Sequence, residues 1–85
     1  MPEENNTIPL TKLPINTKAI VVSIQNDKAI AKKLREMGIV KGITIYTSRI
    51  APLGDPLEIT ILGYKLAIRK NHASGISVKP VEEEK

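Results

Sequence analysis

The sequence predicts a mainly β domain, a small barrel of about five strands with one short α-helix between the first and second strands. Apolar and polar residues alternate in five short segments, and the period changes only once to that of a helix. Each strand therefore has one apolar face, and closing the strands around a single core would bury these faces and hide exposed strand edges. A length of 85 residues leaves room for one domain.

The single helix is predicted over residues 27–37. Its apolar side has residues at i, i+4 and i+7, namely Ile30, Leu34 and Met37. Asn26 or Asp27 is expected to cap the start of the helix, because a short polar side chain there can accept a backbone hydrogen bond. Gly38 stands where a left-handed residue ends a helix, and Ile39 is then expected to pack back on the helix.

Turn-forming residues set the limits of the other elements. Strands are expected at residues 18–24, 43–50, 57–61, 65–69 and 76–80. Gly63-Tyr64 fits a two-residue type II′ hairpin turn, and residues 70–74 are expected to form a simple turn. Leu10–Leu13, between two prolines, is expected to be an extended lead-in.

Domain limits follow from the same reading. Residues 1–9 are expected to be a flexible arm, residues 10–81 one folded domain, and residues 82–85 an acidic tail. The arm is polar and acidic, unlike a secretory signal, and the longest apolar runs have four residues, so we expect a cytoplasmic protein without membrane insertion.

Composition excludes several kinds of chemistry. Cysteine is absent, which excludes disulfides, thiolate metal sites and a cysteine nucleophile. The chain has no phosphate-binding glycine motif and only one histidine, His72. The sequence therefore predicts a binding module that is not an enzyme and needs no cofactor, no metal and no catalytic residue.

Charge is unevenly distributed along the chain. Residues 15–81 hold eleven Lys and Arg against four acidic residues, a net charge of +7, whereas the tail is acidic. A basic domain can bind nucleic acid, an anionic membrane surface or an acidic protein. Nucleic acid is disfavoured as the partner, because the chain has only two aromatic residues for base stacking and one helix to enter a groove.

Two surfaces are candidates for partner binding. The outer side of the predicted helix repeats basic residues at i, i+4 and i+7. The segment 52–56 holds two prolines, which leave a loop little entropy to lose on recognition. The candidate residues are Lys28, Lys32, Arg35, Pro52, Leu53, Gly54, Asp55 and Pro56. A solvated helix face and a tight strand connection are the plain structural alternatives.

Two motifs resemble the FeoA family. The first is Leu34-Arg35-Glu36-Met37-Gly38-Ile39-Val40-Lys41-Gly42, and the second is Ala51-Pro52-Leu53-Gly54-Asp55-Pro56. Gly63 and Ala67-Ile68-Arg69-Lys70 extend the resemblance, which spans roughly residues 10–80. Within it, His72 stands where an acidic residue is expected.

The resemblance implies an SH3-like barrel and a role as a small cytoplasmic accessory of bacterial ferrous-iron uptake. It also implies a partner, the membrane transporter FeoB with its cytoplasmic GTP-binding domain. A related fold occurs in DtxR-type metal-dependent repressors, so fold alone leaves transport and transcription open. The alternatives are therefore a regulatory module of a metal-dependent transcription system, a nucleic-acid-binding module, and a metal sensor that uses His72.

Overall fold

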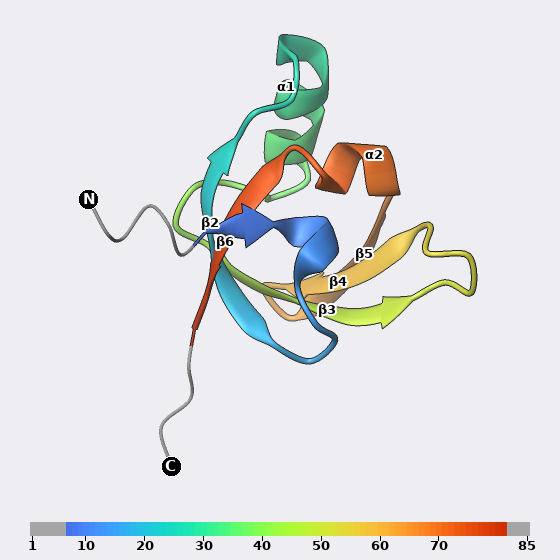
Figure 1. The fold of residues 1–85 in the computed structure, drawn as a ribbon. Coiled ribbons are helices and arrows are strands. Elements are labelled where there is room, and N and C mark those ends of the chain that lie inside the picture. The colour runs from blue at the N-terminus through green and yellow to red at the C-terminus, as the bar shows by residue number, and fades with distance from the viewer. Residues whose placement is uncertain (1–6, 82–85) are drawn as a thin grey trace.

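The structure is a computed structural model that describes residues 7–81, and its main element is one curved antiparallel sheet. The strands follow the spatial order β1-β6-β2-β3-β4-β5, and the sheet wraps around the core in Figure 1. Their bounds are β1 Ile8–Pro9, β2 Lys18–Ile24, β3 Thr44–Ile50, β4 Leu57–Ile61, β5 Tyr64–Ile68 and β6 Ile76–Pro80. The helices are η2 Leu10–Lys12, α1 Lys28–Glu36 and α2 Lys70–Ala73. The predicted mainly β fold with a short helix is confirmed, with six strands in place of five.

The additional strand lies in the segment expected to be a flexible arm. Ile8 pairs with Val78 and Pro9 with Ser77, so β1 is an edge strand beside β6. Proline is tolerated there because an edge strand has one side without ladder hydrogen bonds. The arm prediction is therefore wrong for these two residues, whereas residues 1–6 and the acidic tail 82–85 lie outside the described residues.

The expected extended lead-in is a single turn of 3-10 helix, η2. A spacing of three residues places Leu10 and Leu13 on the same side of such a turn. Both side chains are buried in the core, and the Leu13 N–H donates to the Leu10 carbonyl at 3.1 Å. The prolines on either side restrict the backbone but do not decide between an extended and a turned conformation. Burial of the two leucines accounts for the turn.

The core is aliphatic and is filled from alternate positions of the strands. In β4 the buried residues Leu57, Ile59 and Ile61 alternate with half-buried Glu58 and Thr60, as the period of two requires. Every strand from β2 to β6 contributes to this cluster, and Leu34 of α1 and Ile39 close one end of the barrel. Register shifts in β2 and β3 are of the kind that lets a strand bend around a core.

Both ends of α1 follow from local sequence. The Asp27 side chain caps the start, where its Oδ1 accepts a hydrogen bond from the Ile30 N–H at 3.0 Å. At the other end Gly38 has φ +101°, the Gly38 N–H donates to the Arg35 carbonyl, and the Ile39 N–H donates to the Leu34 carbonyl, both at 3.0 Å. These two bonds form a Schellman motif, which confirms the predicted end of the helix.

Two turns differ from expectation. The β4–β5 turn is centred on Leu62-Gly63, because Ile61 pairs with Tyr64 across it. Leu62 has φ +50° and Gly63 has φ +85°, the two positive values of a type I′ turn, so the predicted type II′ turn at Gly63-Tyr64 is wrong by one residue. Residues 70–73 form α2 where only a turn was expected.

Candidate docking surface

The loop 51–56 between β3 and β4 is held in one conformation by its own backbone. The Gly54 N–H donates to the Ala51 carbonyl at 2.7 Å, and the Ala51 N–H donates to the Pro56 carbonyl at 3.1 Å. Gly54 has φ +85°, a conformation that glycine adopts without strain. Leu53, beside it, is 93% exposed, so the loop presents one leucine almost entirely to solvent.

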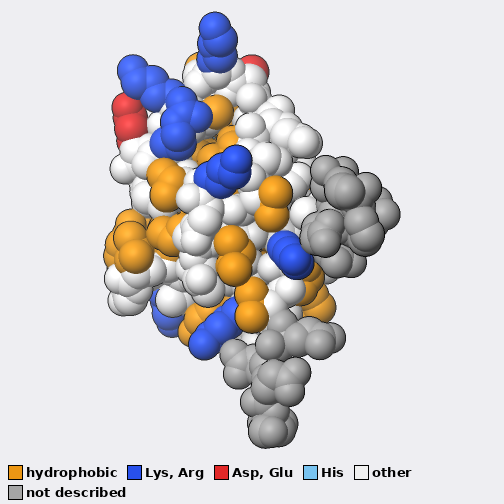
Figure 2. All heavy atoms as spheres, turned by 90° about the vertical axis from the view of Figure 1, so that its left-hand side faces the viewer, with side chains coloured by type: hydrophobic (Ala, Val, Ile, Leu, Met, Phe, Trp, Pro, Cys, Tyr) orange, Lys and Arg blue, Asp and Glu red, His pale blue; other side chains and the backbone are white. Residues whose placement is uncertain are grey.

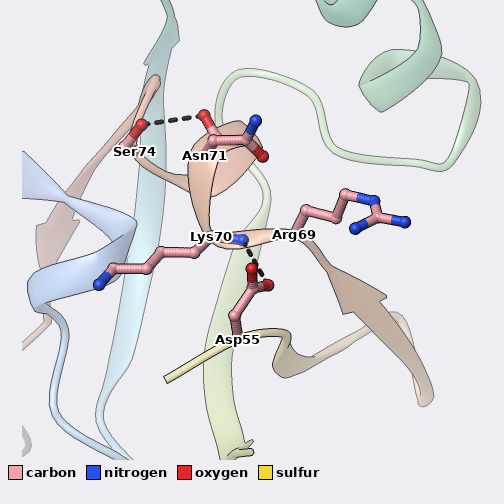
Figure 3. A pocket seen from close by; sticks show the side chains of 5 residues that line it. All are labelled: Asp55, Arg69, Lys70, Asn71 and Ser74. Carbon is pink, nitrogen blue, oxygen red and sulfur yellow. Dashed lines mark hydrogen bonds between the residues drawn. The ribbon is translucent and has the colours of Figure 1, made fainter. Parts of the chain in front are cut away.

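Asp55 ties this loop to the start of α2. Its Oδ1 accepts a hydrogen bond from the Lys70 backbone N–H at 2.9 Å (Figure 3). A free N–H group at a helix start is one of the donors that need a partner, and the carboxylate supplies it. One oxygen of Asp55 is therefore engaged inside the protein. Four of the predicted loop residues are exposed, namely Pro52, Leu53, Asp55 and Pro56, and Leu53 is the large apolar side chain among them.

The predicted basic side of α1 faces solvent. Lys28, Lys32 and Arg35 are all exposed, while Ala31 and Leu34 on the opposite side are buried. In Figure 1 the green helix α1 lies at the top and the yellow 51–56 loop projects to the right, with α2 between them. The structure thus separates the two predicted surfaces instead of joining them into one patch.

Arg69 lies between the two surfaces and was missed as a candidate site residue. It lines a depression with Asp55 and Pro56 on one side and another with Lys33 of α1 on the other. Figure 3 shows the Arg69 and Lys70 side chains pointing in opposite directions from the junction of β5 and α2. The sequence places Arg69 at the end of an expected strand and in a segment that resembles the FeoA family, but assigns it no role in binding. Its position between the loop and α1 is a product of the fold.

His72 is half-buried and lies in positively charged surroundings. It lines a depression of about 140 Å³ between α1 and β5, together with Lys33 and Arg69. Cations as neighbours disfavour a metal ion at the imidazole. Within residues 7–81, no group of three or more His, Cys, Asp or Glu side chains is arranged to hold a metal.

None of the helices in the described part of the chain is long and apolar enough to cross a membrane.

The larger depression of about 490 Å³ near Asp55 is open and is also lined by Arg69, Lys70, Asn71 and Ser74. Two hydrogen bonds of 2.9 Å join its lining residues: the bond from the Lys70 N–H to Asp55, and one from the Ser74 hydroxyl to the Asn71 carbonyl (Figure 3). Fold and surface together define a small β-barrel domain of the binding class, with an exposed leucine and a basic helix face.

The chain belongs to the FeoA family, because the FeoA domain model matches residues 8–80. This domain is a non-catalytic accessory domain associated with ferrous-iron transport. A Porphyromonas gingivalis protein, a fusion of Fe(2+) transport protein A with the Fe(2+) transporter FeoB, is 33% identical over 70 residues. That match covers 82% of this chain and 8% of the fusion protein.

Two solved structures agree in fold. The NMR structure of a FeoA-like protein from Clostridium acetobutylicum has a TM-score of 0.84 and 35% identity, and the match covers 94% of this chain and 93% of that one. The crystal structure of Stenotrophomonas maltophilia FeoA with zinc, described as a prokaryotic SH3 domain protein, has a TM-score of 0.72 and 35% identity. This match covers 82% of this chain and 87% of the S. maltophilia chain. The SH3-like fold implied by the sequence motifs is confirmed.

Proposed function

We propose that this protein is a non-enzymatic adaptor that docks on the cytoplasmic part of FeoB and regulates ferrous-iron uptake. The observation that carries the proposal is the fusion relative, in which a FeoA part and FeoB share one chain. Covalent linkage raises the effective concentration of two parts that work together, and separate chains must replace it with a binding surface.

Leu53 supplies the first such surface. It is 93% exposed on a loop whose conformation is already fixed by backbone hydrogen bonds. Binding of a partner therefore costs the loop little conformational entropy. Apolar side chains at the centre of an interface contribute most when they enter a pocket of the partner. Leu53 is therefore the proposed apolar anchor.

The basic side of α1 supplies the second surface. Lys28, Lys32 and Arg35 face solvent, and cations of this kind raise the rate at which an acidic partner associates. Because this surface is separate from the Leu53 loop, a partner that contacts both must wrap around the α2 side of the domain. Arg69 lies on that path.

Calorimetric titration against the cytoplasmic part of FeoB tests the proposal, with that part empty, bound to GDP and bound to a GTP analogue. Saturable binding that differs between these states makes the protein a nucleotide-responsive regulator, because a ligand shifts an equilibrium only through differential affinity. Equal binding in all states makes it a scaffold. No binding in any state contradicts the proposal and directs attention to a salt-dependent titration with DNA.

A further inference from the structure

The sheet has a free edge at β5. This strand is the last in the spatial order and pairs only with β4, and its register runs without a shift from Tyr64 to Ile68. In a hairpin with a two-residue turn, the pair next to the turn is a hydrogen-bonded pair, and the following pairs alternate. Ile61 and Tyr64 form that first pair, so Lys65 and Ala67 direct their backbone N–H and C=O groups away from β4.

These outward groups have no backbone partner among the described residues outside the ladder. Protein folds commonly blunt such an edge with proline, a bulge, a charged side chain (lysine above all) or a covering element, and Lys65 of β5 is such a charge. β5 contains neither a proline nor a bulge, and the side chains at its two outward positions, Lys65 and Ala67, are exposed. A depression of about 140 Å³ separates Ala67 from Lys33 and Leu34 of α1, so the helix flanks this part of the strand.

Exposed apolar side chains gather where β5 begins. Leu62 is 70% exposed, Tyr64 43% and Val40 40%. The Tyr64 hydroxyl donates to the Met37 carbonyl at 2.9 Å, so the hairpin is fixed to the end of α1. Figure 2, which faces the left-hand side of Figure 1, shows hydrophobic side chains spread over that face below a group of lysine and arginine side chains.

Leu62 is unfavourable in two ways at once. A leucine at φ +50° carries a backbone cost that asparagine or glycine largely avoids, and its side chain is left in water. Strain of this kind persists where the surrounding structure enforces it, and it is frequent at binding sites. The type I′ turn needs no leucine, so a contact outside this chain is the physical reason we assign to it.

Positive charge lies along the same edge. Lys65 is on the strand, and Lys33 and Arg69 line the depression beside it. The one carboxylate that faces the strand from β4 is Glu58, which is opposite Ala67. Asp55 lines a depression with Ala67 and Arg69, so three cations face two carboxylates, and the remaining positive charge favours an acidic ligand and opposes the approach of a second copy of this chain, whose own edge is basic.

We propose that the free edge of β5 accepts an extended acidic segment of a partner protein as an additional strand, with apolar side chains over Leu62 and Tyr64. Backbone groups at alternate positions are satisfied by a peptide and not by a lipid or nucleic-acid surface, which is why a protein segment is the occupant. This surface is additional to Leu53 and the outer side of α1, and its existence does not depend on the partner being FeoB.

NMR titration with an eight-residue peptide of alternating valine and glutamate tests the proposal. The amide signals of Lys65 and Ala67 are expected to shift and to become protected from hydrogen exchange. The same peptide with N-methyl groups on alternate residues keeps its side chains but loses the backbone N–H donors of those residues. It is expected to bind at least fivefold more weakly. A peptide with lysine in place of glutamate is expected to bind more weakly still.

Protein variants locate the site independently of the peptide chemistry. Ala67→Pro removes one outward N–H and is expected to weaken peptide binding about fivefold or more, whereas Ala67→Thr keeps that N–H and is expected to bind normally. Leu62→Asn is expected to weaken binding about threefold. If Ala67→Pro does not fold, the N-methylated peptide still tests whether binding depends on backbone hydrogen bonds to β5.

Equal binding of the N-methylated peptide, or shifts confined to other strands, would overturn strand addition. Self-association of the free protein through the same amides, or equal affinity for vesicles of anionic lipid, would assign the edge to a different occupant and also overturn it. If the peptide does not bind but the protein binds FeoB, the proposed function stands and strand addition at β5 is wrong. If the peptide binds but FeoB does not, strand addition stands and the proposed function is wrong.

Discussion

The Asp55 carboxylate accepts a hydrogen bond from the Lys70 backbone N–H at 2.9 Å, across 15 positions of sequence. This bond joins the loop that presents Leu53 to the first residue of α2. A residue that sequence motifs mark for partner contact therefore also has a task inside the fold. If Asp55 also contacts a partner, its variants are expected to change both stability and binding, so the two effects have to be measured separately.

Asp55→Ala is expected to lower the free energy of unfolding by about 1 kcal/mol, the usual cost of losing a helix cap. Asp55→Asn keeps an acceptor oxygen and is expected to retain most of that stability. Urea unfolding of both variants checks this. Equal losses in the two would show that the charge of Asp55, and not its hydrogen bond, stabilises α2.

Gly38→Ala is expected to cost more than Gly42→Ala, although both glycines have positive φ. Each substitution strains the backbone by about 1–2 kcal/mol. A Cβ at Gly38 would also lie 2.9 Å from the Tyr64 hydroxyl, whereas one at Gly42 meets nothing within 4 Å. The same Cβ would lie 3.2 Å from Ile61 Cδ1, so the difference between the two unfolding free energies measures the crowding of Gly38 by both side chains.

Tyr64→Phe provides the control for this contact. It removes the hydroxyl and its bond to Met37, and alone it is expected to cost about 1 kcal/mol. Combined with Gly38→Ala, it is expected to cost less than the sum of the single changes, because the clash is relieved. Strict additivity would mean that the helix end and the hairpin do not touch in solution.

Leu62→Asn is expected to raise the free energy of unfolding by about 0.5–1 kcal/mol, because asparagine is more easily accommodated at positive φ. Chemical denaturation measures the gain. Ile15→Asn, at another exposed apolar residue, is the matched control, since Ile15 does not have positive φ, and no gain is expected from it. A loss of stability in Leu62→Asn would show that Leu62 packs in solution more than its 70% exposure indicates.

Leu53→Ser is expected to leave stability within about 0.5 kcal/mol, because an exposed side chain contributes little to folding. Its affinity for the cytoplasmic part of FeoB is expected to fall about tenfold if Leu53 is the apolar anchor. Ile15→Ser removes an apolar side chain that is 48% exposed and lies outside this loop, and it is expected to bind normally. An equal loss in both would point to a general effect of surface hydrophobicity.

The double variant Lys28→Glu/Lys32→Glu is expected to associate more slowly with FeoB at low salt, and the difference is expected to shrink as salt rises. Lys12→Glu/Arg49→Glu makes the same change in net charge on other elements. Stopped-flow association rates compare the two. If both variants slow association equally, net charge matters and the α1 surface does not.

Much of the fold is predictable because its signals are local. Alternation in β4 and the cap residues of α1 act within a few positions, and the structure agrees with both. The predicted position of the β4–β5 turn is wrong because leucine gives no sign of a positive φ. The prediction therefore rests on Gly63 alone, which it places first in the turn instead of second. The pairing of Ile61 with Tyr64 places Leu62 in the turn in spite of its low preference for that conformation.

Long-range relationships account for the remaining differences. The pairing of Ile8 with Val78 and the bond from Asp55 to Lys70 join distant segments, and no local pattern encodes either. For the candidate site, the sequence predicts Leu53 and the basic side of α1 as candidates, but it does not show their separation or the place of Arg69 between them. Those facts depend on how the sheet curves.

The most direct test of the central claim is a titration of fluorescently labelled protein with full-length FeoB in lipid nanodiscs. We expect saturable binding that unlabelled protein displaces and that Leu53→Ser weakens about tenfold. Binding to empty nanodiscs of equal strength, or no saturable binding to FeoB at any nucleotide state, would contradict the proposal that this protein acts by docking on the transporter.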